Sequence, residues 1–179
     1  MRIISGKYKG KRLIAPSKLP VRPTTDFAKE ALFNILNNQF YFDETTVLDL
    51  FSGTGNISYE FASRGALSIT SVDGDAGCVK YISKIKDELD FPIKPIKSDV
   101  FAFLEKTTQQ ADIVFADPPY NFDLEQFQKI VTLIFENNLL SEEGILIIEH
   151  SKHTDLSDFK GFTEARKYGG SVFSFFEVS

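Results

Sequence analysis

The chain has 179 residues, a length that fits one compact domain or one domain with a small extension. Hydrophobic residues make up 42% and charged residues 25%, values that exclude a wholly disordered, collagen-like or disulfide-stapled protein. The apolar runs are far shorter than the ~20 residues that cross a bilayer, and Cys78 is the single cysteine. Residues 1–10 have no apolar region behind their basic residues, so we expect no secretory signal. A cytoplasmic protein without a membrane segment or an internal disulfide is expected.

The charge is divided unevenly along the chain. Residues 1–29 hold eight Lys and Arg residues against one acid, a net charge of +7, which leaves −12 on the remainder. A basic end on an acidic body is typical of an element that contacts a polyanion, although a solvated lysine-rich arm has the same composition.

The basic end is predicted to form a β-hairpin followed by a helix. Residues 2–5 and 11–14 flank a glycine-bounded turn, which predicts the hairpin. Thr24 or Thr25 can cap a helix whose apolar residues recur every three or four positions. These apolar residues are Phe27, Ala31, Leu32, Ile35 and Leu36. We expect residues 1–40 to form an extension and residues 41–179 to form the main domain.

The main domain alternates short apolar runs with amphipathic stretches, which is typical of βαβ units on a parallel sheet. The predicted strands are residues 46–50, 68–72, 93–96, 113–116 and 145–148. After Asp123, one face of a predicted helix is apolar as far as Asn137. Residues 162–167 and 172–178, joined by two glycines, predict a terminal antiparallel hairpin at the sheet edge. The fold class is therefore α/β, with a doubly wound, mostly parallel seven-stranded sheet.

A glycine-rich loop follows the first of these strands. Residues 47–56 pass from a buried strand through Gly53 and Gly55 into a helix. Ligands of open α/β sheets lie beyond the carboxyl ends of strands, and glycines let a ligand approach the backbone. Asp73 ends the next strand, 20 residues after Gly53, where a carboxylate can accept hydrogen bonds from a ribose diol.

The loop alone is compatible with NAD or with S-adenosylmethionine, and two residues favour the second cofactor. Ser58 stands where the third glycine of a dinucleotide fingerprint is expected. Asp49 lies inside the strand before the loop, where a carboxylate would repel a pyrophosphate but could pair with the ammonium group of S-adenosylmethionine.

Asp99 and Val100 follow the third predicted strand. The Asp99 carboxylate can accept the adenine amino group while Val100 packs on the ring. An aspartate that caps the following helix has the same appearance in the sequence, and both interpretations stay open.

The tetrapeptide Asp117-Pro118-Pro119-Tyr120 follows the strand at 113–116, at the same sheet edge as the glycine loop. The Asp117 carboxylate and the Pro118 carbonyl can accept the two N–H bonds of an exocyclic amine and so direct its lone pair at a methyl group. Pro118 and Pro119 stiffen this geometry, and Tyr120 can stack on an extruded base. An ordinary Asp-Pro turn is the alternative.

Two other groups of reactive residues belong to no motif. Cys78 has no motif neighbour, so it is predicted to fill a helix. Glu149, His150 and His153 suggest a metal site, but no further ligands recur. A satisfied surface pair is the preferred interpretation, and no metal is expected.

Together these motifs resemble the bacterial 16S ribosomal RNA guanine-N2 methyltransferases that modify guanine 966, which have the Rossmann-like class I fold of S-adenosylmethionine-dependent methyltransferases. The matching segments are Arg2 to Gly6, Lys9 to Leu13, Arg22 to Asp26, Glu30, Leu32 to Asn34, Asp49 to Gly55, Glu60, Ser63 to Ala66, Asp117 to Tyr120 and Lys167 to Gly169. The N-terminal segments are the specific part of this resemblance, since many amino-methyltransferases share the glycine loop and the Asp117 tetrapeptide.

The resemblance implies a monomeric enzyme that methylates a guanine flipped out of 16S rRNA, within the assembled small ribosomal subunit and without a metal. The implied catalytic residues are Asp117, Pro118, Pro119 and Tyr120. The implied cofactor-binding residues are Asp49, Phe51, Gly53, Thr54, Gly55, Asp73, Asp99 and Val100. The implied RNA-binding residues are Lys9, Lys11 and Arg12 in the hairpin, together with Arg22 and Thr24, which face either the cofactor or the RNA.

Two residues depart from the family pattern. The family usually has Glu in place of Asp73, so Asp75 is a possible substitute for the ribose contact. The family usually has Gly in place of Ser58, a change expected to affect helix packing more than chemistry.

Three alternative functions stay open from the sequence. The Asp117 tetrapeptide fits adenine N6 or another RNA base as well as guanine N2, although the chain leaves no segment for a separate DNA-recognition domain. A non-catalytic RNA-binding factor could retain a cofactor pocket. An NAD-dependent dehydrogenase would leave the tetrapeptide unexplained.

Overall fold

A single seven-stranded sheet organises the protein in the computed structural model, which describes residues 1–178. The strand order is β3-β2-β1-β4-β5-β7-β6, in which β1 to β5 are parallel and β7 is antiparallel to both of its neighbours. The strands are β1 (Thr46–Leu50), β2 (Ser68–Asp73), β3 (Ile93–Lys97), β4 (Ala111–Ala116), β5 (Leu140–Ser151), β6 (Phe162–Tyr168) and β7 (Ser171–Glu177). The predicted fold class and the C-terminal hairpin are confirmed.

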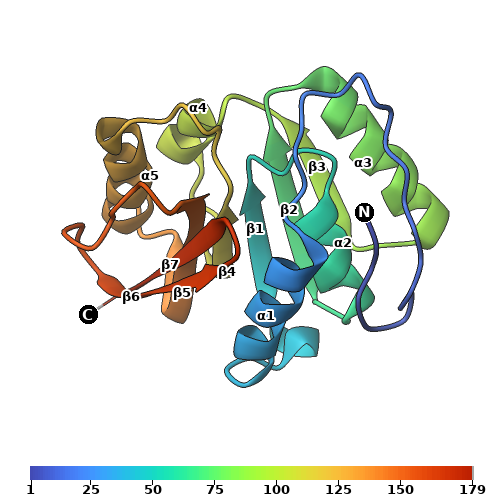
Figure 1. Ribbon diagram of the computed structural model, residues 1–179, viewed down its shortest axis with the longest axis horizontal. Coiled ribbons are helices and arrows are strands. Elements are labelled where there is room, and N and C mark those ends of the chain that lie inside the picture. Colours follow the sequence, from blue (N-terminus) through green and yellow to red (C-terminus); the bar gives the residue numbers. More distant parts are fainter. Residues whose placement is uncertain (179) are drawn as a thin grey trace.

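Helices cover both faces of this sheet, as Figure 1 shows. They are α1 (Asp26–Asn37), α2 (Asn56–Ser63), α3 (Ala76–Leu89), α4 (Val100–Lys106) and α5 (Leu124–Glu136), with a short 3-10 turn at Phe42–Glu44. Helices α1, α2 and α3 share one apolar cluster with β1 and β2, and α4 and α5 bury their apolar sides in a second cluster on the opposite face. The sheet therefore buries an apolar cluster under helices on each of its faces, which is the doubly wound arrangement.

The ends of the helices follow from local capping. Thr25 caps α1 by accepting a hydrogen bond from the backbone N–H of Ala28. Asp123 and Gln126 form a reciprocal capping box at the start of α5, and that helix ends at Glu136 with Asn137 as its C-cap, where the sequence predicts the end. Within residues 1–178, no helix is both long enough and apolar enough to cross a membrane.

The predicted N-terminal hairpin forms, but it is short. Its two arms pair antiparallel through one β-bridge between Arg2 and Arg12, with backbone hydrogen bonds from Ile3 to Lys11 and from Leu13 to Met1, both at 2.9 Å. Next to this bridge, the backbone N–H groups of Ile4 and Ser5 donate to the Glu60 carboxylate on α2, at 2.8 and 3.1 Å. Glu60 thereby binds this segment, the N-terminal loop, to the domain.

Glu60 is the centre of a buried polar group that joins the N-terminal loop, α1 and α2. Its side chain has no exposed surface and also accepts from Arg64 at 2.8 Å and pairs with Lys29 at 3.4 Å. Lys29, 1% exposed, additionally donates to the Arg2 carbonyl and to the Asn56 side chain. The basic loop is therefore fixed to the α1–α3 face of the sheet by a paired ion cluster.

Replacement of Lys29 tests this attachment. The Lys29→Met variant leaves Glu60 with one fewer buried partner, so the free energy of unfolding should fall by about 3 kcal/mol. Urea denaturation measures it. The matched control is Lys84→Met, which removes an exposed pair with Glu88 and should cost less than ~1 kcal/mol. Equal effects of the two variants would contradict the role assigned to the cluster.

Candidate active site

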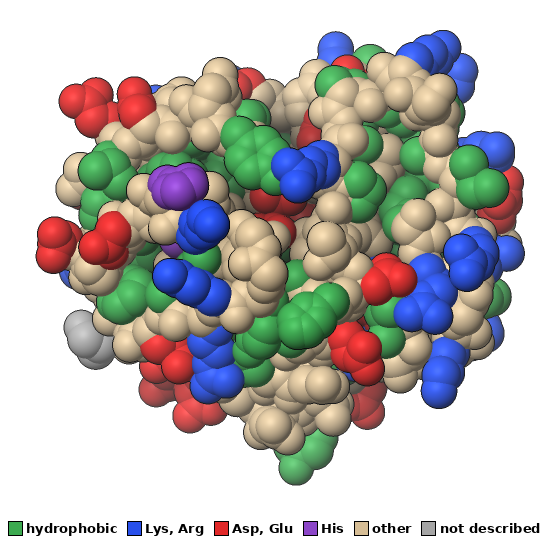
Figure 2. Space-filling model, viewed as in Figure 1, with side chains coloured by type: hydrophobic (Ala, Val, Ile, Leu, Met, Phe, Trp, Pro, Cys, Tyr) green, Lys and Arg blue, Asp and Glu red, His purple; other side chains and the backbone are tan. Residues whose placement is uncertain are grey.

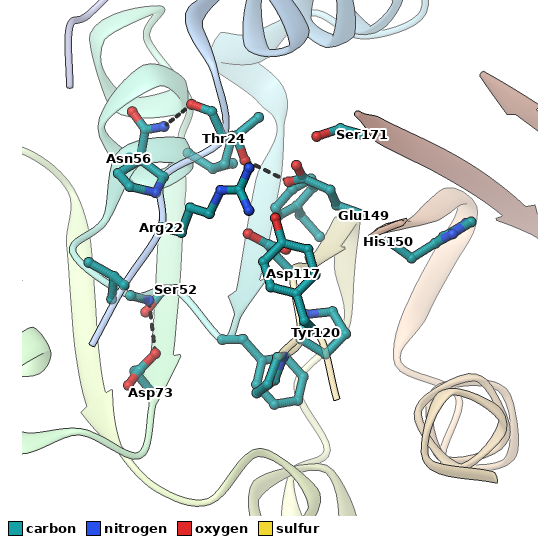
Figure 3. A pocket seen from close by; sticks show the side chains of 18 of the residues that line it. Arg22, Thr24, Ser52, Asn56, Asp73, Asp117, Tyr120, Glu149, His150 and Ser171 are labelled. Atoms are coloured by element: carbon teal, nitrogen blue, oxygen red, sulfur yellow. Dashed lines mark hydrogen bonds between the residues drawn. The ribbon is translucent and has the colours of Figure 1, made fainter. Parts of the chain in front are cut away.

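A cavity of about 1200 Å³ lies at the carboxyl ends of the parallel strands. Its walls include nearly all of the residues expected to bind cofactor or base: Arg22, Thr24, Asp49, Phe51, Gly53, Thr54, Asp73, Asp99, Val100 and Asp117 to Tyr120. Figure 3 shows the inward-pointing side chains. The sheet topology thus brings the glycine loop and the Asp117 tetrapeptide, which are far apart in the sequence, to one cavity.

Asp73 organises the glycine loop from the neighbouring strand. Its carboxylate accepts from the backbone N–H groups of Gly53 at 2.8 Å and Asp75 at 2.9 Å. Gly55 lies just behind the cavity wall as the N-cap of α2, with φ of 93°. A Cβ there would collide with the Tyr59 ring, so this position requires glycine.

The two candidates for the ribose contact have different surroundings. Asp75 caps α3 by accepting from the Cys78 N–H at 2.9 Å. Asp73 is half-buried in the cavity wall, and each of its oxygens can accept a second hydrogen bond. Asp75 is also half-buried in the cavity wall, so the choice between the two for the diol stays a prediction.

The next strand end carries Asp99 and Val100. Asp99 is exposed and caps α4 by accepting from the Ala102 N–H at 2.9 Å, which confirms the capping interpretation. Both residues also line the cavity. Their contact with adenine therefore stays a prediction, in addition to the capping role of Asp99.

Asp49 is the most deeply buried acid of the cavity, at 1% exposure. Ser58 on α2 donates to its carboxylate at 2.6 Å and lies 2.6 Å from the Ser71 hydroxyl. Burial raises the Asp49 pKa to about 7. The expectation that Ser58 affects packing more than chemistry is wrong, because its hydroxyl directly contacts this acid.

Asp117 lies beyond the end of β4, half-buried in the cavity wall. Burial, and then the nearby charges of Glu149 and Asp49, raise its pKa well above the usual range, and Arg22 acts in the opposite direction. Pro118 is buried, whereas the Tyr120 ring is 70% exposed. The tetrapeptide therefore combines a half-buried acid with an exposed aromatic ring.

Glu149 and His150, which the sequence predicts to be a surface pair, are buried at 7% and 8% exposure. That prediction is wrong because β5 continues to Ser151 and carries both residues into the sheet. His150 contacts the Ser174 hydroxyl at 2.7 Å and points away from the rest of the group in Figure 3. Glu149 faces the cavity beside Asp117. Among residues 1–178, no cluster of three His, Cys, Asp or Glu side chains could hold a metal ion.

Residues 19–25 pass over the cavity and contribute Arg22 and Thr24 to it. The Arg22 guanidinium lies 5.1 Å from the centroid of the Tyr120 ring. The Thr24 hydroxyl donates to Glu149 at 2.6 Å, and the Thr24 carbonyl accepts from Asn56 at 3.0 Å. Both residues therefore lie at the Asp117 end of the cavity.

The predicted RNA-binding residues of the N-terminal loop lie elsewhere. Lys9, Lys11 and Arg12 are exposed and do not line the cavity. Figure 2 shows Lys and Arg side chains gathered on the side where Figure 1 places this loop and α3. The basic surface and the cavity are thus spatially separate.

The fold is that of class I methyltransferases. A Thermus thermophilus 16S rRNA N2 G1207 methyltransferase, solved with AdoMet and guanosine, has a TM-score of 0.68 at 20% identity, over 89% of this chain and 45% of that chain. A second Thermus thermophilus structure, of the hypothetical protein TTHA0928, has a TM-score of 0.85 at 25% identity, over 99% of both chains.

The family described as Conserved hypothetical protein 95 matches residues 1–177, so the chain belongs to it. The relatives include proteins named Ribosomal RNA small subunit methyltransferase D, among them one from Buchnera aphidicola and one from Escherichia coli K12. The Buchnera aphidicola protein is 33% identical over 83% of this chain and 75% of its own length. The Escherichia coli K12 protein is 30% identical over 83% and 74%. The resemblance stated from the motifs is confirmed.

The buried Asp49 carboxyl gives a testable pH dependence. Because its folded-state pKa of about 7 exceeds the usual 3.8, the folded state binds more protons between these values. The free energy of unfolding should therefore fall as pH rises through this window. Asp49→Asn should reduce that slope by up to ~1.4 kcal/mol per pH unit, measured by urea denaturation from pH 4 to 8. An unchanged slope would contradict burial of an ionisable Asp49.

Proposed function

We propose that this protein is an S-adenosylmethionine-dependent methyltransferase that modifies the exocyclic N2 of a guanine in 16S rRNA, of the guanine 966 type, within the assembled small subunit. The observation that carries the proposal is the single cavity in which Asp117-Pro118-Pro119-Tyr120 faces the glycine loop. The names of the relatives and the class I fold support it. We place the enzyme in the cytoplasm as a monomer.

The cavity residues fit the cofactor. Asp49 is a buried acid whose carboxylate accepts from the Ser58 hydroxyl, and an ammonium group beside it would stabilise its charged form. Gly53 would let the cofactor approach the backbone closely, with Phe51 and Thr54 beside it. Gly55 shapes the turn behind them, and Asp73 would accept the ribose hydroxyls. Asp99 and Val100 would hold the adenine. Bound S-adenosylmethionine supplies the methyl group.

The Asp117 segment prepares the base for transfer. The Asp117 carboxylate and the Pro118 carbonyl accept the N–H bonds of the guanine amine, which favours a lone pair directed out of the ring plane. Tyr120 presents an exposed ring on which the flipped base stacks. Since these groups stand at fixed strand and loop positions, little reorganisation precedes reaction.

RNA docking is assigned to the basic part of residues 1–40, and catalysis to residues 41–179 together with Arg22 and Thr24, which line the cavity. Lys9, Lys11 and Arg12 are exposed on a loop that Glu60 fixes to the domain. The chain beyond residue 29 has a net charge of −12. Most of the attraction to phosphates is therefore assigned to the basic N-terminal segment, and the alternative is that ribosomal proteins supply part of the docking surface.

Transfer of labelled methyl from S-adenosylmethionine to small ribosomal subunits that lack the modification tests the function. Nucleoside analysis should find N2-methylguanosine. Label in N6-methyladenosine or another nucleoside would overturn the target, and absence of label would favour a non-catalytic factor. Deproteinised RNA, assayed in parallel, tests whether the assembled particle is required.

Asp117→Asn distinguishes the proposed chemistry from binding alone. Loss of the charged acceptor should lower kcat by about 10²- to 10³-fold, while the Kd for S-adenosylhomocysteine, measured by calorimetry, should stay within about threefold. An unchanged kcat would remove Asp117 from the mechanism.

The triple change of Lys9, Lys11 and Arg12 to Ala tests the docking loop. It should weaken binding to the RNA substrate and lower the slope of log affinity against log salt by up to ~0.9 for each phosphate that is no longer neutralised. Filter binding at several salt concentrations measures this slope. Unaltered salt dependence would exclude the loop from docking.

A further inference from the structure

We propose that Glu149 selects guanine by accepting the N1–H of the flipped base, beside the amine held by Asp117. This inference rests on the proposed function and deepens it. The Asp117 tetrapeptide recognises an amine that guanine and adenine both have, so a second group must distinguish the two bases.

The sheet places the two acids next to each other. Ala116 on β4 and Ile148 on β5 are paired in parallel register, and Asp117 and Glu149 are the residues that follow them. Neighbouring strands are about 4.8 Å apart, and side chains alternate between faces. Phe115 and Ile147, two residues earlier, lie in the same apolar cluster. Both acids therefore project towards one face, and both line the cavity.

Glu149 is held in place but retains hydrogen-bonding capacity. Thr24 donates to Oε2 at 2.6 Å, and a carboxylate can accept about four hydrogen bonds through its two oxygens. Burial raises the pKa of Glu149, and its charge raises that of Asp117. Thr24, Ser171 and Arg22 offset the burial of Glu149 only in part, because its pKa is still raised. A ligand edge that brings N–H groups to both acids would stabilise them.

Guanine has such an edge and adenine does not. Guanine presents N1–H and the N2 amine as adjacent donors, so Asp117 can hold the amine while Glu149 accepts from N1. Adenine presents an N1 lone pair next to its amine, which a carboxylate would repel. A buried Glu149 carboxylate that faces the N1 lone pair of adenine has no hydrogen bond to accept, and this loss discriminates strongly against adenine.

The analogue 2-aminopurine keeps the N2 amine and lacks both the N1–H and O6, so only a preference for guanine that depends on Glu149 assigns the N1–H contact. Small subunits reconstituted with guanine or 2-aminopurine at the target position serve as the two substrates. The wild-type protein should prefer guanine in kcat/KM by about 10- to 100-fold. In Glu149→Gln the amide can donate to N1, so kcat/KM for guanine should fall and the preference should narrow to about threefold or less.

The controls separate specificity from folding. Glu142→Gln changes an exposed glutamate on the same strand and should retain the full preference. Binding of S-adenosylhomocysteine, measured by calorimetry, establishes that Glu149→Gln is folded. Equal losses on both substrates would overturn the role of Glu149 and leave the proposed function intact. Failure of the wild-type protein to methylate guanine would overturn both.

Discussion

The buried carboxylate of Glu60 is the group on which the rest of the molecule depends. It binds two backbone N–H groups of the N-terminal loop, the Lys29 ammonium and the Arg64 guanidinium. Lys29 extends the network to Asn56, which in turn holds the carbonyl of Thr24. The same chain of interactions therefore fixes the basic loop and positions the segment that covers the cavity. A buried charge requires such complete pairing, because removal of one partner is costly.

A second constraint is the concentration of acids at the carboxyl ends of the strands. Asp49, Asp73, Asp117 and Glu149 all line the cavity, from the ends of four different strands. Three of them have polar partners that hold them in place: Ser58 for Asp49, the glycine loop for Asp73, and Thr24 for Glu149. Such a site suits a cationic cofactor and a base that donates hydrogen bonds, and it disfavours a ligand with a pyrophosphate.

The sequence predicts the fold class, caps for α1 and α4 and most of the cavity, because these depend on local periodicity and on recognisable motifs. It misses Glu149, which follows the apolar run at 145–148 just as Asp117 follows 113–116, but without a motif to mark it. It also misjudges Ser58, since a hydroxyl that contacts Asp49 across a strand and a helix leaves no local pattern. The attachment of the N-terminal hairpin is missed for a related reason, because its acceptor, Glu60, lies more than 50 residues away.

Because Glu60 fixes the basic loop to an acidic body, the separation of charge is a rigid property of the folded molecule. A net charge of +7 at one end and −12 on the remainder gives the protein a permanent electric dipole. In the field of a polyanion such a molecule is rotated before it makes contact, with its basic side leading. Encounters are thereby biased in orientation and in rate, and this steering weakens as the Debye length shortens.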